Sequence, residues 1–181
     1  MLRRSQCSPA TSGSPHPQRR RKPMTQSEIA PVLDLLAAFP AVLRDLTRPL
    51  DDTTLRFKPE GEWSVIENVG HLIDIEGIWT GRFQQMLAAE QPTLQRFDVD
   101  ELVRQRSYQQ KQLSGLLGTF SEAREQTIEF LRGLKPLHLE RTGVHPTYGI
   151  ITLSQAIGIM SKHDYLHHDQ IEKTVAQAKE K

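Results

Sequence analysis

Three histidines have the residue type and the spacing to bind one metal ion together. His163 and His167 are four residues apart, so on a helix both imidazoles project from one face, one turn apart. Two nitrogens placed in this way can share an ion at about 2.0–2.1 Å each. A third nitrogen could come from His71 on another helix. Three protein ligands would leave a coordination position open, as in catalytic sites and unlike purely structural ones.

Carboxylates interrupt the apolar stripes of the same two segments. Glu76 occupies a slot that the three-and-four step reserves for an apolar side chain, and so do Asp164 and His167. Burying an unpaired carboxylate costs several kcal/mol, so each one needs a cationic partner. That partner is either a metal ion or a Lys or Arg of another helix. An isolated pair of histidines at this spacing also fits two half-exposed surface side chains.

Four long amphipathic segments have the length to position these groups. Their periodicity predicts helices over about 27–50, 64–89, 107–134 and 152–178. Two of the starts carry capping boxes, Ser64-x-x-Glu67 and Thr152-x-x-Gln155. Pro40 should kink the first helix. No convincing strand alternation is visible, and only the short apolar run 149–153 is ambiguous.

An all-α four-helix bundle is the economical way to bury four such stripes. The predicted connections, 51–63, 90–106 and 135–151, are longer than the roughly 2–8 residues usual in bundles. Such lengths permit crossover connections in place of simple turns. The middle connection also contains a candidate short helix at about 98–106.

Composition predicts one folded domain with a basic extension. The chain has 181 residues, 23 Lys and Arg against 22 Asp and Glu, and one cysteine. Residues 1–24 hold six basic residues and no acid, and we predict that they are a disordered basic tail. Equally, translation could begin at Met24. Residues 25–181 are expected to form the bundle, and they carry 17 basic against 22 acidic residues.

The same composition excludes several classes of function. No apolar run approaches the ~20 residues that cross a bilayer, so we expect no membrane partner. The predicted bundle is mildly acidic and has no basic stripe, which argues against nucleic acid as a partner. The lone Cys7 excludes an internal disulfide and fits a reducing compartment, so we expect a cytoplasmic protein.

Two short motifs resemble those of the DinB-like (DNA-damage-inducible, YfiT-like) superfamily. The first is Trp63-Ser-Val-Ile-Glu-Asn-Val-Gly-His71-Leu-Ile-Asp-Ile-Glu76, and the second is His163-Asp-Tyr-Leu-His167-His-Asp-Gln170-Ile. The family pattern is a tryptophan just before helix two, a histidine on helix two, and a His-x3-His pair on helix four, often followed by Gln-Ile. All three parts occur here in that order, and the resemblance covers about residues 27–178.

The resemblance implies a specific topology and a specific site. The family is a four-helix bundle with up-down-down-up topology and is frequently homodimeric. Carried over to this sequence, its metal ligands would be His71, His163 and His167, and they would hold a divalent ion, most often nickel or zinc. Several members are transferases or isomerases that use a low-molecular-weight thiol such as bacillithiol or mycothiol. Others are named metal-dependent hydrolases.

The sequence therefore predicts a metal-dependent enzyme, a thiol-dependent transferase or a hydrolase, acting on a small-molecule substrate. Glu76 is the candidate catalytic group nearest the open position, with a buried ion pair to another helix as the alternative. The candidates for orienting the imidazoles through their second nitrogens are Asp74, Asp164 and Gln170. The competing hypothesis is a non-catalytic helical binding or dimerisation module, with a structural metal or none. A homodimer is expected in either case.

Overall fold

The computed structural model describes residues 25–180. The elements in chain order are α1 (Gln26–Thr47), α2 (Asp52–Arg56), α3 (Val65–Ala88), α4 (Val99–Arg106), the 3-10 turn η1 (Tyr108–Gln110), α5 (Leu113–Arg132), α6 (Pro136–Leu139), β1 (Thr142–His145), β2 (Gly149–Thr152) and α7 (Leu153–Lys179). The predicted disordered tail, 1–24, lies outside the described residues. Within 25–180, no helix is both long enough and apolar enough to cross a membrane.

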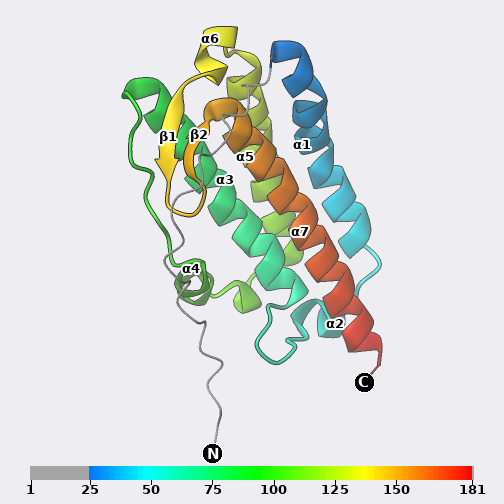
Figure 1. The fold of residues 1–181 in the computed structure, drawn as a ribbon. Coiled ribbons are helices and arrows are strands. Elements are labelled where there is room, and N and C mark those ends of the chain that lie inside the picture. The colour runs from blue at the N-terminus through cyan, green and yellow to red at the C-terminus, as the bar shows by residue number, and fades with distance from the viewer. Residues whose placement is uncertain (1–24, 181) are drawn as a thin grey trace, which may run out of the picture.

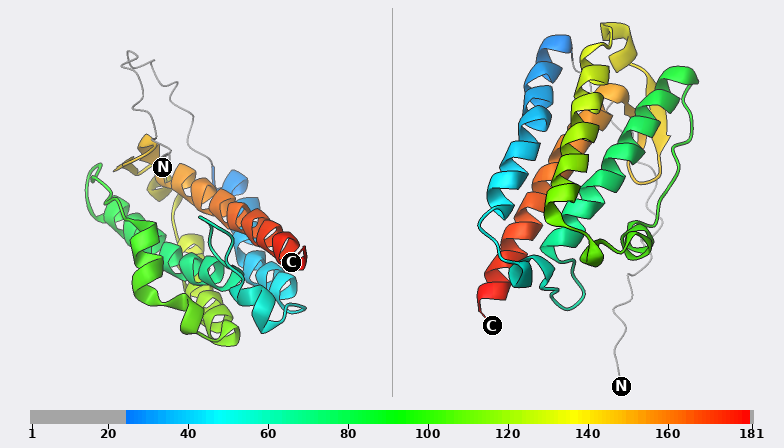
Figure 2. Two further views of the ribbon diagram at one scale, coloured as in Figure 1. Left: turned by 90° about the horizontal axis from the view of Figure 1, so that it is seen from below. Right: turned by 180° about the vertical axis from the view of Figure 1, so that it is seen from behind.

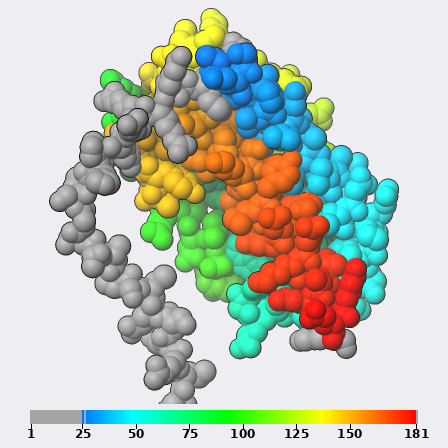
Figure 3. Space-filling model, turned by 45° about the vertical axis from the view of Figure 1, so that its right-hand side comes forward, coloured from blue at the N-terminus to red at the C-terminus, as the bar shows by residue number. Residues whose placement is uncertain are grey.

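The four long helices α1, α3, α5 and α7 form the predicted four-helix bundle (Figure 1). In that view α1 and α7 run downward and α3 and α5 run upward, which confirms the up-down-down-up order. Because α3 and α5 are parallel, the chain must return along the whole bundle between them. The connecting segment, residues 89–112, does so beside α3, and it carries α4 (Figure 2). The helices α1 and α7 form a continuous face of the molecule (Figure 3).

Local capping fixes where the two helices with histidines begin. The Ser64 hydroxyl accepts from the Glu67 amide at 3.3 Å, and the Glu67 carboxylate accepts from the Ser64 amide at 2.9 Å. Thr152 and Gln155 form the same reciprocal pair at the start of α7. Each pair satisfies amides that have no partner inside the helix. Both predicted starts are confirmed, so the registers of α3 and α7 follow from the sequence.

Two predicted features differ from the structure. The third long helix begins at Leu113 and not near 107, because Ser107 has a left-handed backbone (φ 52°) that ends α4 and is followed by η1. The connection before α7 contains an antiparallel hairpin, β1–β2, which the sequence pattern did not predict beyond the ambiguous run 149–153. Each strand has only four residues. The distant 92–94 segment supports β1, since Val144 exchanges backbone hydrogen bonds with it at 2.8 and 2.9 Å.

Gly70 allows the returning segment, residues 89–112, to pack closely against α3. A Cβ atom at this position would lie 2.2 Å from the ring of Tyr108, far inside van der Waals contact. The absence of a side chain therefore lets the Tyr108 ring lie directly on the helix backbone. The Tyr108 hydroxyl donates to Asp74 Oδ2 at 2.8 Å, which fastens η1 to the same helix.

A polar layer divides the core into two apolar clusters. On α5, Phe120 belongs to one cluster and Ile128 to the other, and Arg124 lies between them. Glu76 from α3 and Asp164 from α7 meet Arg124 at the same level, and all three side chains are buried. The histidines of the candidate site lie near this layer, since the charge of Arg124 acts on one of them.

Candidate metal site

The three histidines predicted to share an ion lie together between α3 and α7. His71 Nε2 is 3.4 Å from His163 Nε2, and His163 Nε2 is 3.2 Å from His167 Nε2. The three ligand nitrogens lie within 4.8 Å of one another. His71 and His167 are buried, whereas His163 is partly exposed. The cluster is therefore enclosed by the bundle, and His163 is its most exposed member.

These nitrogen separations match those of a small metal centre. Two nitrogens at about 2.0–2.1 Å from one ion and about 109° apart are separated by about 3.3 Å. The two measured spacings, 3.4 and 3.2 Å, lie on either side of that value. A neutral imidazole nitrogen either carries one proton or accepts one. Hydrogen bonds among the three imidazoles alone therefore cannot give every one of these nitrogens a partner. The residues present therefore fit a divalent ion held by imidazole.

Asn68 fixes the tautomer of one ligand. Its Oδ1 lies 2.7 Å from His167 Nδ1, while its Nδ2 donates to the carbonyl of Ser64 at 3.0 Å. Because the amide nitrogen is committed to a carbonyl acceptor, the oxygen must face His167 and accept its Nδ1 proton. The lone pair of His167 is then on Nε2, the atom that points at the other imidazoles. Sequence reasoning did not single out Asn68.

Trp63 covers the cluster from the segment just before α3. Its ring is stacked on His167, with centroids 6.0 Å apart and planes 10° apart, and its centroid is 4.6 Å from that of His71. An aromatic ring in this position restricts how the two imidazoles can turn. It also gives the site an apolar wall.

Burial keeps all three imidazoles neutral. Burial lowers the pKa of His71 to about 2, with further contributions from His167 and His163. It lowers the pKa of His163 to about 4, assisted by the charge of Arg124, and that of His167 to about 3, assisted by His163. Neutral imidazole is the form that binds metals. The site therefore presents three ligands in their binding state at neutral pH.

Next to the histidines, Arg124 binds two carboxylates. Its Nε donates to Glu76 at 2.9 Å, and its Nη1 and Nη2 donate to the two oxygens of Asp164 at 2.7 and 3.0 Å. Nη1 also donates to the carbonyl of Leu36 at 2.9 Å. Burial lowers the pKa of Arg124, but the charges of Asp164 and Glu76 outweigh it, and the pKa is raised overall. The guanidinium is therefore charged.

The carboxylates predicted to serve the site thus have other partners. Glu76 forms the buried ion pair given above as its alternative role, and its Oε1 has no hydrogen-bond partner among the described residues. Asp164 pairs with the same guanidinium. Asp74 faces outward, to Tyr108 and to Arg106 at 3.4 Å, and does not reach the Nδ1 of His71, which is buried without a partner in the described chain.

Gln170 lies at the exposed end of the site. It hydrogen-bonds to His167 and thereby raises the pKa of that imidazole against the larger effect of burial. Of the residues predicted to orient the imidazoles, Gln170 alone contacts one of them among the described residues. His168, the next histidine along α7, lies apart from the cluster, beside Asp169 and Glu172.

Comparisons with known proteins identify the family of the chain. The DinB superfamily matches residues 35–171 of the chain. The "Putative metal-dependent hydrolase YfiT" of Bacillus subtilis is 28% identical over 137 residues, which cover 75% of this chain and 77% of that protein. The "Putative metal-dependent hydrolase OB0782" of Oceanobacillus iheyensis is 26% identical over 133 residues, covering 69% and 77%.

A solved structure shares the architecture. The structure of YfiT from Bacillus subtilis, described as a probable metal-dependent hydrolase with an unusual four-helix bundle topology, superposes with a TM-score of 0.80 at 25% identity. The superposition covers 87% of this chain and 91% of that one. The match of sequence motifs, topology and family leads to one conclusion: the chain belongs to the DinB superfamily.

Proposed function

We propose that the chain is a metal-dependent enzyme that acts on a small molecule, with His71, His163 and His167 holding a divalent ion. The observation that carries this proposal is the convergence of three neutral imidazole nitrogens inside the bundle, with Nε2 of His163 3.4 Å from that of His71 and 3.2 Å from that of His167. Arg124 engages the neighbouring carboxylates, so the donors are imidazole nitrogens. Such donors favour nickel, copper or zinc over magnesium, and nickel or zinc is our choice.

The proposed reaction is nucleophilic attack on the substrate, by water in a hydrolase or by a low-molecular-weight thiol in a transferase. The names of the two relatives support hydrolysis. When bound, a divalent ion with an open position supplies Lewis acidity and lowers the pKa of a coordinated water or thiol. The partly exposed side of His163 is where a substrate would approach.

The protein's own side chains have distinct roles in this proposal. Asn68 holds the proton of His167 on Nδ1, and Trp63 walls the site on one side. Glu76 stays the candidate catalytic group, since its Oε1 is buried without a partner among the described residues. Its other oxygen is held by Arg124.

Metal analysis of the full chain, made without a histidine tag, tests the site. We expect about one equivalent of nickel or zinc, lost in a His163→Ala, His167→Ala double variant. His168→Ala is the matched control, because it removes a histidine of the same helix that faces Asp169 and Glu172. Metal content that is unchanged in the double variant would contradict the proposed ligands.

Activity assays then separate the enzyme from the non-catalytic module. The metal-loaded chain is assayed against a panel of activated esters and amides, and against electrophiles with bacillithiol, mycothiol and glutathione. We expect turnover with water or with a thiol, and its loss in the double variant but not in His168→Ala. Metal binding with no turnover in either arm would instead favour a structural ion in a binding or dimerisation module. The predicted homodimer and cytoplasmic location stay predictions.

A further inference from the structure

A second cavity lies outside the bundle core, between α3, α5 and the returning segment with α4. Its volume is about 790 Å³, within the ~300–1,000 Å³ typical of small-molecule sites. Apolar side chains from all three elements line it, among them Ile78, Phe97 and Leu116. None of the three clustered histidines is among its lining residues.

Arg82 of α3 is a buried cation in the wall of this cavity. It is 9% exposed, and among the described residues it has no carboxylate within ion-pair distance. Its Nη2 donates to the carbonyl of Gln95 at 2.9 Å, Nη1 lies 3.2 Å from His145 Nε2, and Nε has no partner there. The guanidinium is also 4.8 Å from the centroid of Trp79. These neutral contacts hold the cation in place and leave its charge uncompensated.

The charge balance of the cavity differs from that of the chain. Three cationic side chains line it, Arg82, Arg106 and Lys111, against the single carboxylate of Asp74. That carboxylate already pairs with Arg106. Residues 25–181 as a whole carry more acidic than basic residues, 22 against 17. An uncompensated buried charge is costly, and an anion in the cavity would remove that cost.

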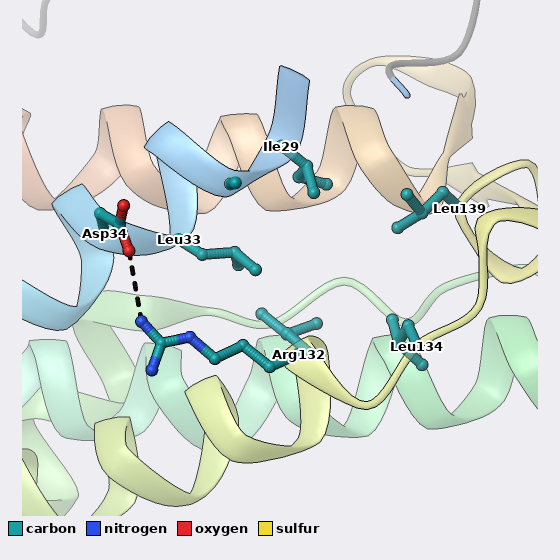
Figure 4. A pocket seen from close by; sticks show the side chains of 8 residues that line it. Ile29, Leu33, Asp34, Arg132, Leu134 and Leu139 are labelled. Carbon is teal, nitrogen blue, oxygen red and sulfur yellow. Dashed lines mark hydrogen bonds and ion pairs between the residues drawn. The ribbon is translucent and has the colours of Figure 1, made fainter. Parts of the chain in front are cut away.

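The smaller cavity of about 150 Å³ between α1, α5 and α6 shows the contrast (Figure 4). It also has an arginine in its wall. There, however, Arg132 pairs with Asp34 at 3.2 Å, as the dashed line shows. That wall supplies its own counter-charge, and the wall beside Arg82 does not.

Glycines on two helices keep the larger cavity open. A Cβ atom added at Gly77, Gly81 or Gly115 would meet no atom within 4 Å. All three residues line the cavity. The space beside them is therefore wide enough for the body of a ligand, next to the buried cation.

We propose that this cavity binds a small organic anion, a carboxylate or a phosphate monoester with an apolar or aromatic body, through Arg82. The anionic group lies against the guanidinium, and the body lies over the glycines between α3 and α5. Arg106 and Lys111 add to the positive field. The site is separate from the histidine cluster and does not depend on a metal.

Matched fluorescent probes test this proposal on the full chain. The anion 1-anilinonaphthalene-8-sulfonate is compared with N-phenyl-1-naphthylamine, which has the same rings and no charge. We expect saturable binding of one equivalent of the anion. Arg82→Met should weaken anion binding at least tenfold and change binding of the neutral probe less than threefold. Displacement by benzoate and by phenyl phosphate, but not by benzyl alcohol, then identifies which anionic group is preferred.

A second variant keeps the test valid if Arg82→Met does not fold. Gly81→Leu places a side chain in the cavity, at a position where an added Cβ atom would meet no atom within 4 Å, and should weaken both probes at least tenfold. Gly158→Leu adds the same side chain to open space on α7, outside the cavity, and should leave both probes unchanged. Chelator-treated protein should bind the anion as well as untreated protein. Binding that survives Gly81→Leu, or that is lost with the metal, would overturn the proposal.

Discussion

Two polar clusters interrupt the apolar core, and they are built on opposite principles. Around Arg124, the guanidinium hydrogen-bonds to Glu76, Asp164 and the Leu36 carbonyl, so the cationic side chain is satisfied by the protein itself. In the histidine cluster, three neutral imidazole nitrogens face one another, and Nε2 of His163 lies 3.4 Å from that of His71 and 3.2 Å from that of His167. In the first cluster the protein supplies the counter-charges itself, whereas the second presents three neutral ligand nitrogens that could hold an ion.

This difference suggests different roles for the two neighbouring clusters, the Arg124 cluster in the stability of the fold and the histidine cluster in metal binding. Removing one member of a buried ion pair is costly, because the remaining charged groups are neither paired nor solvated by water. A cluster of neutral imidazoles can lose one member without leaving a charge behind. We therefore expect substitutions at Arg124 to act on folding and substitutions at the histidines to act on metal binding.

Removing the guanidinium should give the largest effect. Arg124→Met leaves Glu76 and Asp164 buried without a counter-charge, so the free energy of unfolding should fall by about 3–5 kcal/mol. Urea unfolding of the full chain measures this. Replacing Glu76 and Asp164 by Leu in the same variant should restore much of the loss, since an apolar set avoids the charge. A loss below about 1 kcal/mol for Arg124→Met would contradict the comparison.

Metal removal should give the next largest effect. An ion that binds only the native state adds about 2.7 kcal/mol to the free energy of unfolding when its free concentration is a hundredfold above Kd. A chelator should therefore lower the Tm of wild-type protein and leave the Tm of His167→Ala unchanged, because that variant has lost a ligand. Differential scanning calorimetry with and without chelator measures both. Equal shifts in the two proteins would place the stabilising ion elsewhere.

The orienting hydrogen bond of Asn68 should tune the site without destroying it. Asn68→Leu removes the acceptor for His167 Nδ1, and such losses typically cost 10- to 100-fold in metal affinity. Asn68→Asp keeps an acceptor in place and should lose less. Competition with a chelator of known affinity measures the metal affinity of each variant. We expect Asn68→Asp to bind the metal more tightly than Asn68→Leu.

The smallest effect is expected for an ion pair at the surface. Lys173 and Glu62 form an ion pair at 2.6 Å, with side chains 58% and 41% exposed. Lys173→Ala should change the free energy of unfolding by less than about 1 kcal/mol, because water solvates both groups. The same urea measurement as for Arg124 applies. A cost as large as that of Arg124→Met would mean that burial does not distinguish the two pairs.

Much of the scaffold was predictable because its signals are local. The capping boxes at Ser64 and Thr152 each depend on residues three positions apart, and both helices begin where predicted. The inward phase of Glu76 and Asp164 also followed from periodicity, and both are buried. Arg124 could have been found in the same way, since it occupies a slot between Phe120 and Ile128 on α5.

The remaining features depend on contacts between distant segments. Periodicity places Asp74 one turn from His71, but it does not show that Tyr108 approaches α3 from outside and takes that carboxylate. The hairpin was missed because its four-residue strands are supported by the 92–94 segment. Helix α5 starts later than predicted because Ser107 has a left-handed backbone, and a serine in the sequence gives no strong signal for that conformation.

The contact between Gly70 and Tyr108 has a mechanical consequence. The aromatic ring lies on the main chain one residue before the first imidazole. Tyr108, which lines the outer cavity beside Arg82, therefore packs on the same turn of α3 that carries His71 of the metal site. We therefore expect a side chain added at Gly70 to displace Tyr108 and to disturb both the outer cavity and the α3 turn that carries His71.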